Sequence, residues 1–387
     1  MNNTVGRPVS GTDFAFREKS LKKAIRYLNN ENSFIILGIR RTGKSSFLQQ
    51  VAHLIRNEND KHICIELDCQ TFTNMYDFYK GLYNEMPKSL KTRFRKFLAD
   101  SQRLPKKLID GLTDVFDSVE IMDTKIDFQD KLINYSKPFE ELVTSFFKDS
   151  ENVYLFLDEL PFFFENIGQE KKHIQEITQI LTNLRSWRHA GLPIGITGSL
   201  NLHQQLEHLG ISRKLLAGLN TIELDPLTKE ESKQLIEMLL ENENYNWWTP
   251  EITEKLLSLL PDYIPYFLQY AFNEIAVQEC KSPQEVEEVY HNEIMAGLFK
   301  DFIYQFDERL KIFNGSDFNK AMAILDCIAL EEDISLQRLQ EKIGTDFNYN
   351  MMVKLIDHEF ITLSGKQEYS FTLKMIKDWW IQKRNLK

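Results

Sequence analysis

Short apolar runs alternate with amphipathic helical patterns over the first 225 residues of the chain. Each run is four to six residues long, the length of a strand rather than of a buried helix. Strands that alternate with helical patterns are typical of a parallel sheet covered by helices. The sequence therefore predicts a first domain at residues 1–225 with five strands, at residues 34–37, 62–67, 153–157, 193–197 and 221–224.

The pattern changes after residue 225, where helical segments follow one another without strands. These segments lie at residues 229–243, 251–260, 265–280, 283–296 and 299–313. Consecutive helical patterns indicate a helical domain. We expect residues 226–313 to form such a domain, which would act as a lid.

The last part of the chain, residues 314–387, combines helical and strand-like patterns. Three helix-like stretches and two strand-like ones follow each other at residues 318–329, 335–343, 349–358, 361–363 and 369–371. Ser364-Gly365-Lys366 would form the turn between the two strands. This order predicts a winged helix-turn-helix domain.

Composition places the chain among globular proteins. It has 387 residues, of which 42% are hydrophobic, enough for more than one domain core. No apolar run approaches the roughly 18 residues of a membrane helix, and the first residues lack the apolar core of a signal peptide. We therefore expect a cytoplasmic protein without membrane contact. Its cysteines show no zinc or CxxC spacing and are expected to be reduced thiols: Cys64, Cys69, Cys280 and Cys327.

A phosphate-binding loop is predicted where the first strand runs into a helical pattern. The loop has the Walker A pattern and reads Gly38-Ile39-Arg40-Arg41-Thr42-Gly43-Lys44-Ser45, followed by Ser46. The two glycines let backbone amide groups turn toward the phosphates, and the helix N-terminus adds positive potential there. Lys44 is expected to reach the β- and γ-phosphates of ATP, and the Ser45 hydroxyl to bind Mg²⁺.

A second, independent motif is the apolar run at residues 153–157, which ends in Asp158-Glu159. This pattern is that of a Walker B strand. Asp158 would hold Mg²⁺ through water, and Glu159 would orient or deprotonate the water that attacks ATP. The alternative is a core strand that ends in two solvated acids.

Together the motifs resemble those of STAND-type AAA+ ATPases, close to an archaeal and bacterial ATPase family with a GxRRxGKS P-loop, a DE Walker B and a C-terminal winged helix. The resemblance covers most of residues 12–383 and includes Phe14 with Arg17-Glu18, Asp158-Glu159 before Leu160-Pro161, and the strand before Gly198-Ser199. It implies an α/β P-loop NTPase fold of the AAA+ type. It further implies slow, Mg²⁺-dependent ATP hydrolysis, binding of ATP and ADP, and self-association or a protein effector.

The resemblance extends to the lid and breaks down at two places. Tyr263-Ile264-Pro265-Tyr266 resembles the family motif in which a proline, here Pro265, lies against adenine, but the usual glycine of that motif is missing. The family arginine before the fifth strand is also missing, because the chain reads Gly218-Leu219 there. The position of adenine is therefore less defined than that of the phosphates.

Two further groups of residues are candidates for sensing or stabilising the γ-phosphate. Thr197 or Ser199, at the end of the fourth strand, would sense it, although ordinary turn chemistry also explains Gly198-Ser199. Arg213, or Arg185 and Arg188, would serve as an arginine finger. The alternative for each arginine is an exposed or salt-bridged side chain.

A basic segment stands out in a chain whose net charge is -10. Residues 88–107, within a predicted helical insertion at about residues 85–137, hold eight basic side chains and one acidic one. The apolar spacing of Leu90, Phe94, Phe97 and Leu98 predicts an amphipathic helix with a basic outer face. Such a face would bind nucleic acid or an acidic protein, or would only be solvated.

Two classes of function therefore stand against each other. The first is a nucleotide-dependent molecular switch whose lid and winged helix move with the nucleotide. The second is a DNA- or RNA-loading ATPase that grips nucleic acid through the basic helix and the winged helix. Residues 316–387 carry ten basic and eleven acidic residues, whereas phosphate binding needs a cationic surface. Charge alone therefore favours the switch.

Overall fold

The chain divides into two compact units. The computed structural model describes residues 1, 3–100, 136–150, 152–167, 171–198, 202, 206–207, 209–241, 243, 245–311, 313, 315–331, 333–344, 347–364 and 366–386. The first unit comprises Met1–Arg7, Ile39–Thr42 and Asp225–Lys387, and the second comprises Pro8–Gly38 and Gly43–Leu224. Ser199, Gly365 and most of the predicted basic insertion lie outside the described residues.

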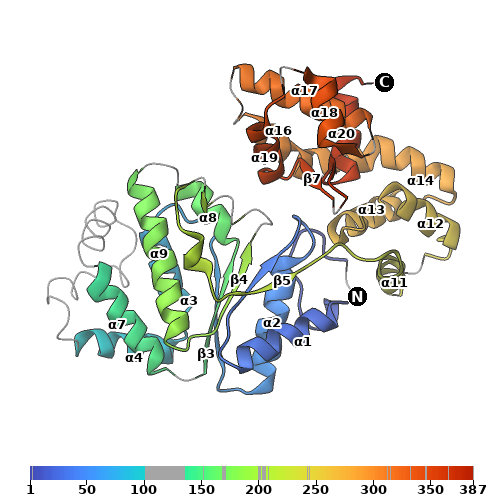
Figure 1. Cartoon of the computed structure of the whole chain (residues 1–387). Helices are drawn as coiled ribbons and strands as arrows, with labels where there is room; N and C mark the ends of the chain where they lie inside the picture. The colour runs from blue at the N-terminus through green and yellow to red at the C-terminus, as the bar shows by residue number, and fades with distance from the viewer. Residues whose placement is uncertain are drawn as a thin grey trace. The chain divides into compact units, whose positions relative to one another are not determined.

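A parallel five-stranded sheet forms the centre of the second unit (Figure 1). Its strands follow the spatial order β2-β3-β4-β1-β5. They are β1 (Phe34–Leu37), β2 (Ile63–Asp68), β3 (Val153–Asp158), β4 (Ile194–Gly198) and β5 (Asn220–Glu223). The predicted strands are confirmed, with each end within one residue of its expected place. Since β4 pairs with both β1 and β3, the carboxyl ends of these three strands meet at one edge of the sheet.

Helices cover both faces of the sheet (Figure 1), and alternate residues of the strands face the two layers. Phe34, Ile36 and Phe156 pack against α1 (Glu18–Asn29) and α2 (Lys44–Glu58). Residues of the opposite parity, such as Ile35 and Leu155, face the second layer. This layer contains α3 (Met75–Glu85), α4 (Lys88–Ala99), α7 (Ser136–Lys148), α8 (Leu160–Ile167) and α9 (Lys171–His189). Two 3-10 turns, η1 (Gly11–Asp13) and η2 (Arg213–Leu216), complete the described elements of this unit.

The first unit contains the helices that the sequence predicted after residue 225. They are α11 (Lys229–Leu240), α12 (Pro250–Leu259), α13 (Pro265–Val277), α14 (Pro283–Val289), η3 (Tyr290–Ile294), α15 (Met295–Leu298), η4 (Phe299–Ile303) and α16 (Tyr304–Leu310). The start of α11 is stabilised by a capping box between Thr228 and Glu231. None of the helices in the described part of the chain combines the length and the apolar character needed to cross a membrane.

One helical prediction was wrong. Two separate helices were expected at residues 283–296 and 299–313, but the helix runs on from Pro283 to Leu310 through two π-helical segments, η3 and η4. Gly297 does not end it. A Cβ atom at this position would lie 2.8 Å from Cζ of Tyr270 in α13, so the glycine makes room for that ring within a continuing helix.

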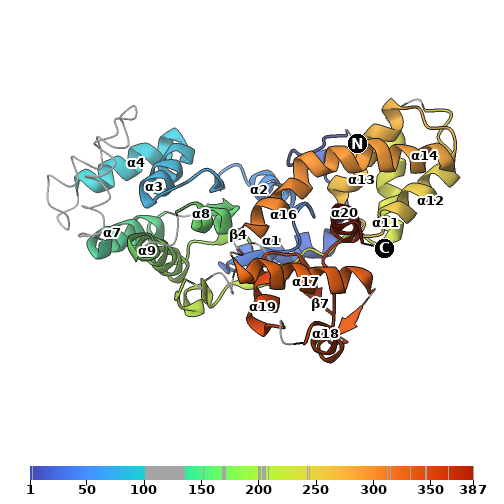
Figure 2. The same cartoon turned by 90° about the horizontal axis from the view of Figure 1, so that it is seen from above.

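The last part of the first unit has the element order of a winged helix. Its elements are α17 (Ser316–Leu330), β6 (Ile334–Ser335), α18 (Leu336–Ile343), α19 (Tyr349–Asp357), β7 (Ile361–Leu363), β8 (Glu368–Phe371) and α20 (Lys374–Arg384). The strands form an antiparallel sheet in the order β6-β8-β7. Figure 2 shows α17, α18 and α19 grouped around β7. We call residues 316–384 the winged-helix segment.

Candidate nucleotide site

The Walker A residues form a tight loop between β1 and α2. Gly43 caps α2 with a φ of 93°, a backbone conformation that glycine adopts at no steric cost. The Lys44 ammonium group is buried and donates a hydrogen bond to the carbonyl oxygen of Gly38, at 3.0 Å. The buried Thr42 hydroxyl donates to the carbonyl oxygen of Ile39, at 2.8 Å. The first bond holds the lysine side chain against the start of the loop, and the second closes the loop on itself.

The N-terminus of α2 is suited to an anion. Its first turn contains no acidic residue, so nothing of the helix itself opposes the positive end of the helix dipole. The Ser46 hydroxyl accepts the backbone N–H of Val9 at 3.1 Å, and Gln50 accepts that of Gly11 at 2.6 Å. Ser46 therefore fastens the preceding segment to α2, a role that the Walker A pattern alone does not reveal.

The Walker B carboxylate lies in a hydrogen-bonded cluster with residues of the two neighbouring elements. Thr197, at the end of β4, is fully buried, and its hydroxyl donates to Oδ1 of Asp158 at 2.6 Å. The same hydroxyl oxygen accepts the backbone N–H of Glu159, at 2.9 Å. The Ser45 side chain is a further hydrogen-bond partner of Asp158. The strand order explains this meeting, since β4 lies between the strand of the P-loop and the Walker B strand.

Burial sets the proton affinity of Asp158. Desolvation raises the pKa of this carboxyl above its ordinary value, and the negative charge of Asp68 adds to the effect. The hydrogen bonds from Thr197 and Ser45 oppose the rise, as does the positive charge of Lys44. The cluster thus holds a carboxylate next to a hydroxyl and near an ammonium group. Oxygen ligands of this kind fit Mg²⁺, which binds through one or two carboxylates together with the phosphates of its nucleotide.

Glu159 has an uncommon backbone conformation for its residue type. Its φ is 53°, in the left-handed region, which costs a residue with a side chain roughly 1–2 kcal/mol. The hydrogen bond from its N–H to Thr197 fixes this conformation. Such strain is frequent where a side chain must point in one direction for function.

The three candidate arginines lie on two elements, Arg185 and Arg188 on α9 and Arg213 in η2. Arg188, on α9, donates to the carbonyl oxygens of Leu215 at 2.9 Å and Ala217 at 3.2 Å. Burial, together with the charge of Arg185, lowers its pKa to about 10. Arg188 thus fastens the chain before β5, while the half-exposed Arg213 forms an ion pair with Glu207. An arginine-finger role stays a prediction for all three.

The lid motif has a residue with a left-handed backbone. Tyr263 has a φ of 48°, in the region where glycine is usual. Pro265 occupies the first turn of α13, where its lack of an N–H costs nothing. Contact between Pro265 and adenine stays a prediction.

Sequence reasoning did not find the partners of the two P-loop arginines. Nε of Arg40 lies 3.5 Å from the Glu359 carboxylate, and the Arg41 guanidinium lies 4.5 Å from the centre of the Tyr266 ring. Glu359 is 319 positions from Arg40 in the chain, and no local pattern marks the pair.

The predicted basic helix is present as α4. Leu90, Phe94 and Leu98 are buried, and the basic side chains occupy its other face, which confirms the amphipathic pattern. Lys91 and Arg95 both contact the Tyr83 ring, and Arg95 donates to its hydroxyl. These two cations therefore support the packing of α4, whereas Lys88 and Lys96 are exposed to solvent.

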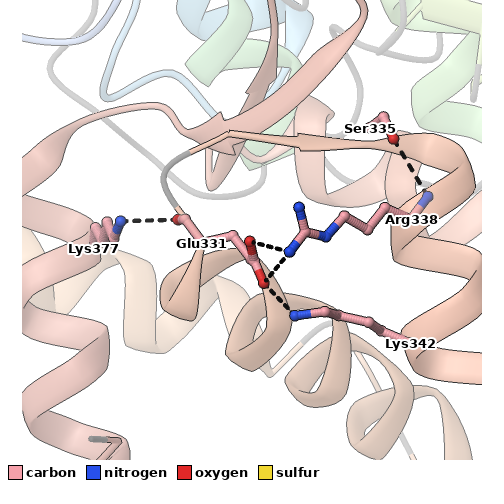
Figure 3. A network of polar contacts seen from close by, with 5 residues as sticks. All are labelled: Glu331, Ser335, Arg338, Lys342 and Lys377. Carbon is pink, nitrogen blue, oxygen red and sulfur yellow. Dashed lines mark hydrogen bonds and ion pairs between the residues drawn. The ribbon is translucent and has the colours of Figure 1, made fainter.

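The winged-helix segment pairs two of its cations internally. Figure 3 shows Glu331, which follows α17, in contact with Arg338 and Lys342 of α18. The backbone carbonyl of Glu331 also accepts a hydrogen bond from Lys377, at 2.9 Å. Nucleic-acid phosphates would have to compete with Glu331 for these side chains.

The strand order, the loop before α2 and the acids after β3 define the fold class as an AAA+-type P-loop NTPase. Neither a family model nor a curated protein matches the chain. Among solved structures, the chain is similar to the Walker-type ATPase paby2304 of Pyrococcus abyssi, with a TM-score of 0.66 and 18% identity over 98% of this chain and 99% of that one. It is also similar to the ORC2 protein of Aeropyrum pernix in its ADPNP-ADP complexes, with a TM-score of 0.56 and 12% identity over 98% and 97% of the two chains. These likenesses confirm the predicted fold, but not the STAND subtype.

Proposed function

We propose that this protein binds ATP and ADP at the Walker A loop and hydrolyses ATP. The observation that carries the proposal is the cluster of Ser45, Asp158 and Thr197, which joins the Walker A helix to the Walker B strand through hydrogen bonds. A core strand that merely ended in solvated acids would not need a buried threonine bonded to the Asp158 carboxylate and to the Glu159 N–H.

Each residue of the site has a distinct task in this proposal. Lys44 and the amide groups at the start of α2 bind the phosphates. The Ser45 hydroxyl and the Asp158 carboxylate would hold Mg²⁺, which supplies positive charge to the phosphate oxygens. Glu159 orients the attacking water and accepts its proton. Thr197 fixes the carboxylate of Asp158 and the backbone of Glu159 relative to each other.

The solved neighbours support nucleotide binding. The Pyrococcus protein is described as a Walker-type ATPase, and the Aeropyrum ORC2 protein was solved in ADPNP-ADP complexes. Both share the fold with nearly the whole chain studied here, including the part that follows residue 225.

ATP turnover tests the proposal. The wild-type protein should release phosphate from ATP in the presence of Mg²⁺, and Lys44→Ala should release none above background, because it removes the cation at the phosphates. Lys88→Ala is a matched control, since it removes an exposed lysine of the same unit, at the start of α4. Equal turnover by wild type and Lys44→Ala would contradict the assignment.

Of the two functions considered for this ATPase, we propose the loading of nucleic acid rather than a STAND-type switch. The likeness to ORC2 supports the loading reading better than a switch of the STAND subtype. The exposed lysines of α4 also provide a cationic face of the kind that phosphates require. The neutral charge balance of the winged-helix segment argues for α4 as the main contact.

Charge reversal on the exposed face of α4 tests nucleic-acid binding. Reversing Lys91 or Arg95 would disturb their contacts with Tyr83, so Lys88→Glu with Lys96→Glu is the cleaner variant. If both lysines contact phosphates, the double variant should bind single- or double-stranded DNA or RNA more weakly, with a log–log salt slope lowered by about 1.4–1.8. ATP turnover without nucleic acid should stay at the wild-type level. A wild-type protein that binds no nucleic acid at any salt concentration would refute the loading function and favour the molecular switch.

A further inference from the structure

Two arginines of the P-loop have partners elsewhere in the first unit. Arg40 and Arg41 occupy variable positions of the Walker A pattern, so phosphate binding by itself does not require arginine there. Arg40 lies 3.5 Å from the carboxylate of Glu359, and Arg41 stacks over Tyr266 with 4.5 Å between its guanidinium and the ring centre. Residues 39–42 belong to the same compact unit as both partners.

Glu359 occupies a place where helices usually have glycine. The Phe360 N–H bonds to the carbonyl of Leu355 at 3.0 Å, and the Glu359 N–H bonds to that of Ile356 at 2.9 Å. This pair of bonds is a Schellman motif at the end of α19, and Glu359 is its left-handed residue, with a φ of 59°. The backbone would be less strained with glycine, so the reason for glutamate lies in its side chain.

The Glu359 side chain is a buried negative charge between two guanidinium groups. The residue is only 5% exposed. Arg309 of α16 lies 3.6 Å from Oε2 of Glu359, the same oxygen that Arg40 approaches, and also donates to the carbonyl of His358 at 3.0 Å. A buried carboxylate is costly unless cations compensate it, so Glu359 and the arginines hold one another in place.

Arg41, like Glu359, combines a left-handed backbone with a side chain that contacts a distant segment. Its φ is 69°, again in the left-handed region, and the side chain contacts Tyr266 near the start of α13. The two strained positions, Arg41 and Glu359, thus both carry side chains that join the P-loop to the segment after residue 225. A loop that only had to bind phosphate would be easier to build with glycine at position 41.

We propose that Glu359 is a positioning residue for nucleotide binding: through Arg40 it holds the P-loop backbone in the shape that receives phosphates. The inference rests on the proposed function of the loop. A loop held in its binding shape loses less conformational entropy when the ligand binds, so the contact raises nucleotide affinity. Because coupling is reciprocal, a bound nucleotide also stabilises α19 and the winged-helix segment. The Arg40–Glu359 ion pair thereby links the nucleotide state to the winged-helix segment.

The experiment is a double-mutant cycle on the affinity for Mg²⁺-ADPNP, measured by calorimetry. The variants are Glu359→Gly, Arg40→Ala and the two combined. Glu359→Gly removes the carboxylate and suits the left-handed backbone, which offsets part of the stability lost with the ion pair, and circular dichroism verifies that each variant is folded at the temperature of the titration. Each single variant should weaken binding at least about fivefold, and the combination should weaken it no further, because both remove the same contact.

Glu331→Gln is the matched control for charge. It removes the same negative charge from the winged-helix segment, but from the network of Figure 3, whose partners are Arg338, Lys342 and Lys377. Nucleotide affinity should stay within twofold of wild type. Hydrogen exchange adds a readout that a purely structural role would not move. ADPNP should slow exchange in α19 of the wild type, and Glu359→Gly should abolish this protection.

The outcomes separate this inference from the proposed function. Wild-type binding with an unchanged affinity of Glu359→Gly would overturn the role of Glu359 and leave the ATP site intact. Additive losses from Arg40→Ala and Glu359→Gly would overturn it too, because independent effects mean that the ion pair is not the link. A wild-type protein that binds no nucleotide would refute both.

Discussion

Thr197 allows the sharpest quantitative test of the site. Its buried hydroxyl makes two hydrogen bonds, one to the Asp158 carboxylate and one from the Glu159 N–H. Thr197→Val keeps the shape of the side chain and removes both. A bond to a charged group contributes roughly 1.5–3 kcal/mol and one between neutral groups about 1 kcal/mol, so the free energy of unfolding should fall by about 2.5–4 kcal/mol.

The pH dependence of this loss has a definite sign. The bond from Thr197 favours the ionised form of Asp158 and so lowers its pKa, against the larger effect of burial. In Thr197→Val the pKa of Asp158 should therefore rise further. The stability difference from wild type should be full at a pH where Asp158 is ionised in both proteins, and should shrink as the pH falls and the carboxyl takes up its proton.

Urea unfolding at several pH values, followed by circular dichroism, measures the effect. Thr197→Ser is the control, because it keeps the hydroxyl and loses only one buried methyl group, worth about 1 kcal/mol. ATP turnover should fall with Thr197→Val and persist with Thr197→Ser. Equal stability of Thr197→Val and wild type, or equal losses in the two variants, would refute the assigned hydrogen bonds.

Two further substitutions test the Walker B acids. Glu159→Gln should retain ATP but slow its hydrolysis about a hundredfold or more, because general-base assistance is worth roughly 10²–10⁴; unchanged turnover would assign the water to another group. Asp158→Asn should make the nucleotide-free protein more stable at neutral pH while removing Mg²⁺-dependent turnover. Burial raises the pKa of Asp158, so the ionised carboxylate of the wild type lowers the free energy of unfolding at any pH above that pKa. The stability gained by Asp158→Asn should therefore vanish as the pH falls through the folded pKa toward the unfolded value near 4. An Asp158→Asn variant less stable than wild type at neutral pH would contradict this expectation.

The sheet and its loop could be predicted because their signals are local. β1 is a continuous apolar run, and the glycines and lysine of the loop follow at fixed spacing. Thr197 was predictable only as one of two sensor candidates, since its contacts depend on the position of β4 between β1 and β3. The sequence of a single segment does not predict where its strand lies in the sheet.

The features that escaped prediction depend on contacts between distant segments. Two separate helices were expected on either side of Gly297, and the Tyr270 ring beside it explains the glycine within a continuing helix. Glu359 follows the helical stretch predicted at residues 349–358, and its burial beside Arg40 and Arg309 follows from the fold alone. Arg188 had the sequence surroundings of a finger candidate, yet it donates to the carbonyls of Leu215 and Ala217.

ATP binding at the Walker A loop underlies every role proposed for the site. Calorimetric titration of the wild-type protein and of Lys44→Ala with Mg²⁺-ADPNP tests it most directly, with circular dichroism to verify that both are folded. We expect saturable binding of one nucleotide per chain by the wild type and no detectable binding by Lys44→Ala, because the buried ammonium group is the fixed cation of the loop. Binding by Lys44→Ala at the wild-type affinity, or no binding by the folded wild type, would contradict ATP binding at this loop.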